Sequence, residues 1–173
     1  QRRRFEKEKQ EAFEFGGFNF ALESLLLLDN IEDPHNVGAV LRSAEVFGFH
    51  GVCLPSKGVP EVYPSVVKVS SGATEFMQIA RDASANQYAR KAQEAGYQIA
   101  ALDMNGKATL DSIKEAAPEK LMLVIGGEDK SVGQFILNMA DHVIGIQQFG
   151  RVNSLNASVA AGIAMHALAG KSA

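Results

Sequence analysis

The sequence has a single cysteine and no long apolar run, and each of these absences excludes a class of protein. Cys53 has no partner for a disulfide within the chain, so we expect it to be a buried structural thiol. No apolar stretch approaches the roughly 20 residues of a membrane-spanning helix, and the first residues lack the apolar segment of a secretion signal. We therefore expect a compact cytoplasmic protein without a membrane partner.

The chain also lacks an excess of positive charge, since its formal net charge is −3 at pH 7. A polyanion would gain no overall electrostatic attraction, so nucleic-acid binding requires a local basic patch or a paired surface. The charged N-terminal segment, residues 1–20, contains one basic cluster, formed by Arg2, Arg3, Arg4, Lys7 and Lys9. Because Glu6, Glu8 and Glu11 lie among these residues, a solvated helix face explains the cluster equally well.

Several signatures of well-known chemistries are missing as well. No Gly-x-Gly-x-x-Gly follows a strand and no Gly-x-x-x-x-Gly-Lys-Ser/Thr occurs, so dinucleotide and P-loop sites lack their phosphate cradle. There is no Gly-x-Ser-x-Gly elbow for a serine nucleophile. The four histidines show no ligand spacing with one another or with Cys53, so the sequence predicts no metal site.

The chain does contain a regular alternation of short apolar runs and helical patterns. This alternation predicts an α/β fold in which helices cover both faces of a mainly parallel sheet, with one domain over residues 21–173. The predicted strands are residues 25–29, 51–54, 78–80, 98–102, 121–125 and 142–146. The predicted helices are residues 36–47, 60–69, 84–95, 131–139 and 156–168.

Ligands of open α/β sheets bind beyond the carboxyl ends of the strands, so the residues that follow each strand are the first candidates. After strand 25–29 a polar turn leads to Asn36, whose side chain can cap the next helix, with Pro34 stiffening the approach. Arg42 lies six positions later, on the same side of the helix and about 9 Å further along it. In this otherwise apolar helix Arg42 must reach an anion or a polar loop, or pair with a carboxylate such as Glu45.

Two further strand ends carry polar groups. Gly126 and Gly127 after strand 121–125 permit a close approach of a ligand, or simply form a turn. Glu128 can orient Arg42 through an ion pair or be a solvated turn residue. Beyond strand 142–146, Ser154 and Asn156 offer donors and acceptors at the start of a helix, or only cap it.

Taken together, the three segments resemble the three motifs of the SpoU (TrmH-like) branch of the SPOUT methyltransferases. Motif one is matched by Asp-Pro-His-Asn-Val-Gly-Ala-Val-Leu-Arg-Ser-Ala at 33–44, and motif two by Ile-Gly-Gly-Glu at 125–128. Motif three is matched by Ser-Leu-Asn-Ala-Ser-Val-Ala at 154–160. The likeness spans about residues 25–168, and three ordered matches are far more specific than any one.

The resemblance implies a fold and a reaction. It implies a deep trefoil knot near the C-terminus, which threads motifs two and three into a cofactor pocket. It also implies methyl transfer from S-adenosyl-L-methionine to a ribose 2′-hydroxyl of rRNA or tRNA, without a metal, by a homodimer. By family analogy, backbone groups around the cofactor-binding residues hold the methyl donor. These residues are Leu102, Gly126, Ile146 and Leu155.

The resemblance further implies roles for the polar residues. Arg42 would accept the hydroxyl proton, a demanding role for a guanidinium that needs help from a nearby backbone phosphate. Asn36, Glu128, Ser154 and Asn156 would place the arginine and the ribose. Arg42 and Asn36 would act on the cofactor of the partner subunit, so the site would be completed across the dimer interface.

Two loops depart from the family pattern. Asp129-Lys-Ser131 stands where Gly-x-Gly is usual, and Ile146-Gln-Gln148 stands where Ile-Pro-Met is usual. These altered loops leave open a non-catalytic RNA-binding protein that keeps the knotted fold. An RNA base methyltransferase is a second alternative, because more distant SPOUT members modify bases. Motif one favours the ribose.

Overall fold

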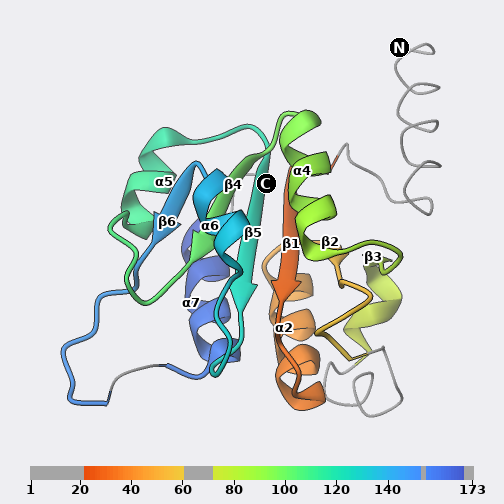
Figure 1. Cartoon of the computed structure of the whole chain (residues 1–173), viewed down its shortest axis with the longest axis horizontal. Coiled ribbons are helices and arrows are strands. Elements are labelled where there is room, and N and C mark those ends of the chain that lie inside the picture. The colour runs from red at the N-terminus through yellow and green to blue at the C-terminus, as the bar shows by residue number, and fades with distance from the viewer. Residues whose placement is uncertain (1–21, 61–71, 153–154, 170–173) are drawn as a thin grey trace.

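Six parallel strands form the sheet at the centre of the computed structural model, which describes residues 22–60, 72–152 and 155–169 (Figure 1). The strand order is β3-β2-β1-β5-β4-β6, and every pair of neighbours is parallel. The strands are β1 Ser24–Asp29, β2 Gly51–Cys53, β3 Gln78–Ala80, β4 Gln98–Leu102, β5 Leu121–Gly126 and β6 His142–Ile144. The predicted α/β class and all six predicted strands are confirmed.

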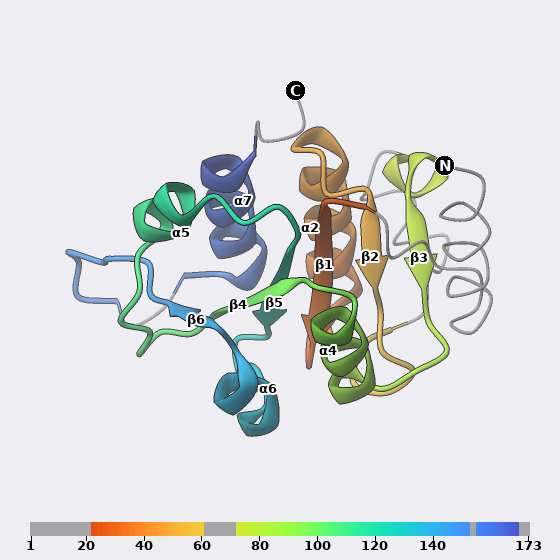
Figure 2. The same cartoon turned by 90° about the horizontal axis from the view of Figure 1, so that it is seen from above.

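Helices cover both faces of this sheet, as Figure 2 shows from above. Alternate residues of a strand point to opposite faces, so β1 sends Leu26 and Leu28 into one core and Leu25 and Leu27 into the other. Helices α2 Pro34–Val46, α5 Leu110–Ala116 and α7 Ala157–Leu168 pack on the first face. Helices α4 Ala85–Glu94 and α6 Gln134–Met139 pack on the second.

Helix α2 begins two residues earlier than predicted. Asp33 is its N-cap, because the Asp33 carboxylate accepts a hydrogen bond of 2.9 Å from the backbone N–H of His35. Pro34 occupies the first helical position, where its fixed φ suits a helix and its missing N–H costs nothing. The predicted capping role of Asn36 is therefore wrong, and its side chain is left for another partner.

Other helix starts also differ from the prediction. Helix α6 begins at Gln134 rather than Ser131, because the buried Asp29 carboxylate binds the N–H of Gly133 at 2.8 Å and holds that stretch as a loop. Helix α5 and a 3₁₀ turn at Ala73–Phe76 were not predicted. The signal for α5 is a reciprocal cap between Thr109 and Ser112, which is easily overlooked in a short helix. The predicted helix 60–69 lies almost wholly outside the described residues, as does the charged segment 1–20.

Strand β6 ends at Ile144, two residues before the predicted end, because the loops after β4 and β6 touch there through their backbones. A Cβ atom on Gly145 would lie 2.3 Å from the carbonyl oxygen of Gly106, and one on Gly106 would lie 2.4 Å from the carbonyl carbon of Ile144. The Gly145 N–H donates to the carbonyl of Ala108 at 3.0 Å. Both glycines are therefore needed for this close approach. The trefoil knot implied by the family resemblance stays a prediction.

Cys53 lies fully buried in β2, as expected for a structural thiol. Its burial raises the pKa of the thiol well above the ordinary value, so the reactive thiolate is suppressed.

Within the described part of the chain, none of the helices combines the length and the apolar composition that crossing a bilayer requires.

The glycine contact predicts a specific sensitivity to substitution. Gly145→Ala should lower the free energy of unfolding by about 1–3 kcal/mol, because its methyl group must displace backbone atoms of the neighbouring loop. Gly150→Ala is the matched control, since nothing lies within 4 Å of a Cβ atom at Gly150. Urea denaturation of the two variants and the parent chain measures the difference. Equal midpoints for the two variants would show that the contact is not tight.

Candidate active site

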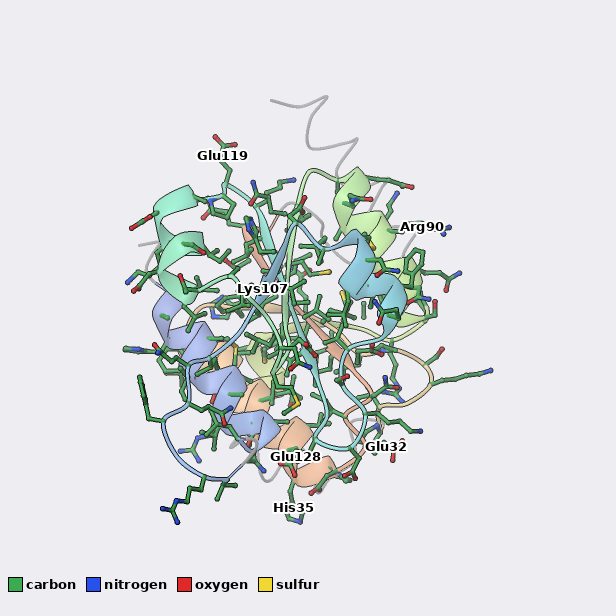
Figure 3. The ribbon with its side chains drawn as sticks, turned by 60° about the vertical axis from the view of Figure 1, so that its left-hand side comes forward. Glu32, His35, Arg90, Lys107, Glu119 and Glu128 are labelled. Atoms are coloured by element: carbon green, nitrogen blue, oxygen red, sulfur yellow. The ribbon has the colours of Figure 1, made fainter. Side chains whose placement is uncertain are left out.

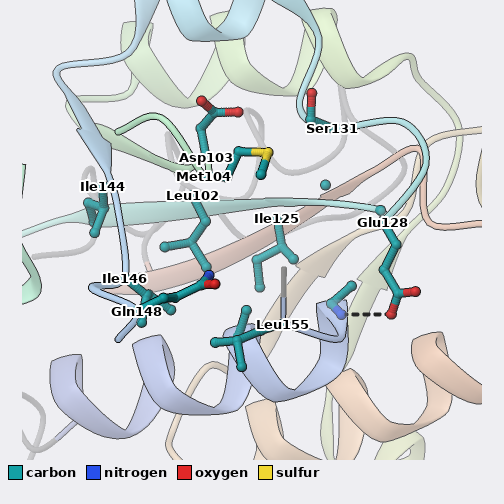
Figure 4. A pocket seen from close by; sticks show the side chains of 14 residues that line it. Leu102, Asp103, Met104, Ile125, Glu128, Ser131, Ile144, Ile146, Gln148 and Leu155 are labelled. Atoms are coloured by element: carbon teal, nitrogen blue, oxygen red, sulfur yellow. Dashed lines mark hydrogen bonds between the residues drawn. The ribbon is translucent and has the colours of Figure 1, made fainter. Parts of the chain in front are cut away.

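The carboxyl ends of the strands carry a concentration of polar side chains. Glu32, His35 and Glu128 lie together at this end of the molecule in Figure 3, whereas Glu119, which precedes β5, lies at the opposite end. The same edge holds a pocket with about 700 Å³ of empty space, part of it open to solvent. Its walls come from the ends of β4 and β5, the loop after β6 and the start of α7 (Figure 4). The pocket thus has the place of a small-molecule site in an open α/β sheet.

All four residues predicted to hold the cofactor line this one pocket. They are Leu102, Gly126, Ile146 and Leu155. Leu102 ends β4, Gly126 ends β5, Ile146 follows β6 and Leu155 precedes α7, so segments far apart in the sequence meet here. With Ile125 and Ile144 they give the pocket a largely aliphatic wall. Their role in binding a cofactor stays a prediction.

Gly126 and Gly127 are required by the chain itself rather than by a ligand. A Cβ atom on Gly126 would lie 2.4 Å from the backbone nitrogen of Val132, and one on Gly127 would lie 2.3 Å from the carbonyl oxygen of Asn30. The loop after β5 therefore folds back tightly on itself and on the end of β1. Of the two interpretations that the sequence left open, the tight turn accounts for both glycines.

Two residues that the sequence analysis did not single out hold this loop in place. Asp29 binds the N–H of Gly133, as described above, and the Asn30 side-chain amide donates to the carbonyl of Ser131 at 3.2 Å. Asn30 has a φ of 55°, a conformation that asparagine tolerates better than most residues. An Asp-Asn pair at a strand end was the available signal. An exposed ion pair of 3.6 Å between Lys130 and Glu32 adds little to this anchorage.

Three of the predicted catalytic residues meet at the N-terminus of α7. A carboxylate oxygen of Glu128 accepts a hydrogen bond of 3.2 Å from the backbone N–H of Ala157, drawn dashed in Figure 4. The Asn156 amide donates to the side-chain oxygen of Asn36 at 3.3 Å. Because both Glu128 and Ala157 line the pocket, this cluster lies at the pocket's edge.

Asn156 is also the N-cap of α7, as one interpretation of the sequence proposed. Its side-chain oxygen accepts from the backbone N–H groups of Ser158 at 2.9 Å and Val159 at 3.4 Å, and the Ser158 hydroxyl donates to the same oxygen. The oxygen therefore caps the helix, while the nitrogen of the same amide contacts Asn36. Capping and site formation are two uses of one side chain.

Helices α2 and α7 lie side by side and run in the same direction. Asn36 and Asn156 touch at the start of the two helices, and the rings of Phe47 and His166 meet at their far ends with centroids 5.4 Å apart. Both helix N-termini are thus at the pocket's edge. Their partial positive charges favour a carboxylate at this position, and Glu128 supplies one.

Arg42 is not among the residues that line the pocket, and its side chain is exposed on α2. Neither of the ion pairs considered for it, with Glu45 or with Glu128, is found in the part of the chain that the structure describes.

Ser154, the fifth residue predicted to be catalytic, lies outside the described residues. In the described ranges, no group of three or more His, Cys, Asp or Glu side chains could hold a metal ion.

The fold and the pocket define an α/β ligand-binding domain whose site lies at the carboxyl edge of a parallel sheet. The model of the SpoU rRNA Methylase family matches residues 23–166 of the sequence. The chain belongs to this family.

Curated relatives agree with this assignment. An uncharacterized tRNA/rRNA methyltransferase of Archaeoglobus fulgidus is 39% identical over 144 residues, which cover 83% of this chain and 63% of that protein. One of Mycolicibacterium gilvum is 37% identical over 145 residues, covering 84% and 46%. A TrmH family tRNA/rRNA methyltransferase of Bacillus subtilis is 35% identical over 141 residues, covering 82% and 56%. The chain thus spans about half the length of the curated relatives it matches.

Solved structures share the fold. An AdoMet-bound rRNA methyltransferase from Sinorhizobium meliloti superposes with a TM-score of 0.76 at 26% identity, covering 84% of this chain and 55% of that one. A TrmH family RNA methyltransferase from Porphyromonas gingivalis gives 0.75 at 27% identity, covering 84% and 58%. A structure that concerns 2-OH methylation of C/U34 on tRNA gives 0.68 at 26% identity, covering 83% and 91%.

The double use of Asn156 can be separated by substitution. Asn156→Ala should lower the free energy of unfolding by about 1 kcal/mol, because two N–H groups of α7 lose their cap. Asn156→Asp should be nearly as stable as the parent, because a carboxylate caps equally well, although it loses the donor to Asn36. Chemical denaturation measures both values. A fully stable Asn156→Ala variant would contradict the capping role.

Proposed function

We propose that this chain transfers a methyl group from S-adenosyl-L-methionine to a ribose 2′-hydroxyl of tRNA or rRNA. The proposal rests on one observation: the expected cofactor-binding residues and three of the expected catalytic residues lie next to each other. The four expected cofactor residues line one pocket, and Asn36, Glu128 and Asn156 form a cluster at its edge. The similarity to the AdoMet-bound Sinorhizobium meliloti enzyme supports the cofactor, and the similarity to the structure on 2-OH methylation of tRNA supports the ribose.

The pocket fits the methyl donor chemically. Its aliphatic wall, with Leu102, Ile146 and Leu155, suits the flat adenine ring, and the exposed Glu128 carboxylate at its edge suits a molecule with cationic groups. Leu102, Gly126, Ile146 and Leu155 would hold the cofactor. When bound, S-adenosyl-L-methionine supplies an electrophilic methyl group on a positively charged sulfur.

The protein's own task is then to position the ribose and to take up a proton. A ribose hydroxyl is a poor nucleophile until its proton is removed or shared, and a fixed orientation lowers the barrier further. Asn156 donates to Asn36, and Glu128 and Asn156 accept from N–H groups at the start of α7, so their positions are defined before substrate binds. Ser154 would join them, and Arg42 would take up the hydroxyl proton as it passes one of its own protons to a backbone phosphate of the RNA.

The position of Arg42 supports a homodimer. Arg42 is exposed on α2 and lies outside the lining of its own pocket, so it is free to serve the pocket of a second copy. Each active site would then combine the pocket of one protomer with the arginine of its partner. This arrangement makes an isolated protomer inactive even when it binds the cofactor.

Methyl transfer to RNA tests the reaction and the residue together. Labelled S-adenosyl-L-methionine is incubated with total RNA from cells that lack this protein, and the product is digested to nucleosides. Label should appear in 2′-O-methylnucleosides, and Arg42→Ala should reduce it by about 10²- to 10⁴-fold while cofactor affinity stays nearly unchanged. Arg90→Ala is the matched control, because Arg90 is an exposed arginine on α4 that stacks on Phe135.

The other outcomes of this assay identify the rival functions. Label in a base would make the chain an RNA base methyltransferase. Cofactor binding with no label in any RNA would point to the non-catalytic RNA-binding protein.

Mixing two inactive variants tests the shared site. Arg42→Ala keeps the pocket, and Leu155→Arg places a charged side chain in the pocket lining but keeps Arg42. Random exchange of subunits should restore about a quarter of the parent's sites, because half of the dimers are mixed and each has one intact site. Restored methyl transfer on mixing checks the prediction. Mixtures that exchange subunits and stay inactive would place Arg42 in the site of its own protomer.

A further inference from the structure

Gln148 brings a polar side chain into the aliphatic part of the pocket. It lies in the loop after β6 and is among the lining residues. Figure 4 shows its amide group pointing into the pocket, toward Leu102. The side chain is exposed, and its amide has no hydrogen-bond partner among the residues that the structure describes. Its donor and its acceptor are therefore both available to a ligand.

The other polar side chains of the lining are placed differently. Glu128 accepts from the N–H of Ala157, and Asp103 accepts from the N–H of Asn105 at 3.1 Å. In Figure 4 Asp103 points away from Gln148, and Ser131 lies on the opposite side of the pocket. Gln148 is thus the side chain that offers an uncharged donor and acceptor beside the aliphatic wall.

This combination matches one kind of chemical group. Aliphatic side chains such as Leu102, Ile146 and Leu155 accommodate a flat, uncharged ring, while a charged group loses hydration against them. A primary amide presents a donor and an acceptor side by side, and adenine presents the complementary pair as its 6-amino group and an adjacent ring nitrogen. Glutamine and asparagine recognise adenine in nucleic acids through such a paired contact.

We propose that Gln148 is a specificity-determining residue that reads the adenine edge of the cofactor through its side-chain amide. The inference rests on the proposed function, because it takes the ligand of this pocket to be S-adenosyl-L-methionine. Gln148 lies at one of the positions where the chain departs from the family pattern. Recognition by a side chain at this position is therefore a property of this chain's own sequence.

Calorimetric titration with two ligands tests this contact without relying on turnover. The ligands are S-adenosylhomocysteine and its analogue in which the purine lacks the 6-amino group. In the parent chain the analogue should bind about five- to tenfold more weakly, the effect of one or two hydrogen bonds. Gln148→Met has a similar length and no amide, so it should bind S-adenosylhomocysteine about five- to tenfold more weakly and should no longer distinguish the two ligands.

Gln147→Met is the matched control, since Gln147 is the adjacent exposed glutamine and does not line the pocket. It should retain the parent's affinities for both ligands. If Gln148→Met and the parent distinguish the ligands equally, the Gln148 contact is refuted and the proposed function stands. If the parent does not bind S-adenosylhomocysteine at all, the cofactor assignment fails and the Gln148 contact fails with it.

Discussion

The backbone N–H groups at the start of α7 need hydrogen-bond partners, and this requirement organises the candidate site. The first N–H groups of any helix have no partner within the helix. In α7 the side chain of Asn156 accepts from two of them, and Glu128, more than 25 residues earlier in the chain, accepts from Ala157. Glu128 is thereby fixed at the pocket's edge by a bond that also completes a helix cap. The site's geometry and the stability of α7 depend on the same contacts.

Close backbone contacts between loops supply the second constraint. The loops after β4 and β6 meet at Gly106 and Gly145, and the loop after β5 folds against the end of β1 at Gly127. None of these glycines has a positive φ, so what each position requires is the absence of a side chain. These contacts hold the end of β4 against the end of β6 and the end of β5 against the end of β1. The aliphatic wall of the pocket is built on those strand ends.

The strands were predictable because burial on both faces leaves a continuous apolar run in the sequence, as in the five buried residues of β1. Helix starts were less predictable because they depend on single side chains. Asp33 rather than Asn36 caps α2, and Asp29 keeps Gly133 in a loop although the surrounding sequence suits a helix. The Asp29 contact joins residues 104 positions apart, so local patterns do not reveal it. The Asp33 cap is local, but Asn36 is an equally good capping residue nearby.

The candidate site was predictable in its members and less so in its contacts. Ordered motifs identified Asn36, Glu128 and Asn156, and these three residues do meet. The sequence offered Arg42 or solvent as the partner of Glu128, whereas the structure gives it the N-terminus of α7. The sequence could not indicate this contact, because the donor is a backbone N–H group and does not depend on which side chain residue 157 carries.

Arg42 has no ion-pair partner in the described part of the chain. Glu128, one of the carboxylates considered as its partner, accepts a hydrogen bond from the start of α7 instead. An exposed ion pair contributes at most about 1 kcal/mol, so leaving the guanidinium without one costs the fold little. A chain with a net charge of −3 draws RNA only through local positive groups, and an exposed arginine without a carboxylate partner in the described part of the chain is such a group. Arg42 is therefore available to an anion outside the described part of its own chain, and a phosphate next to the target ribose is such an anion.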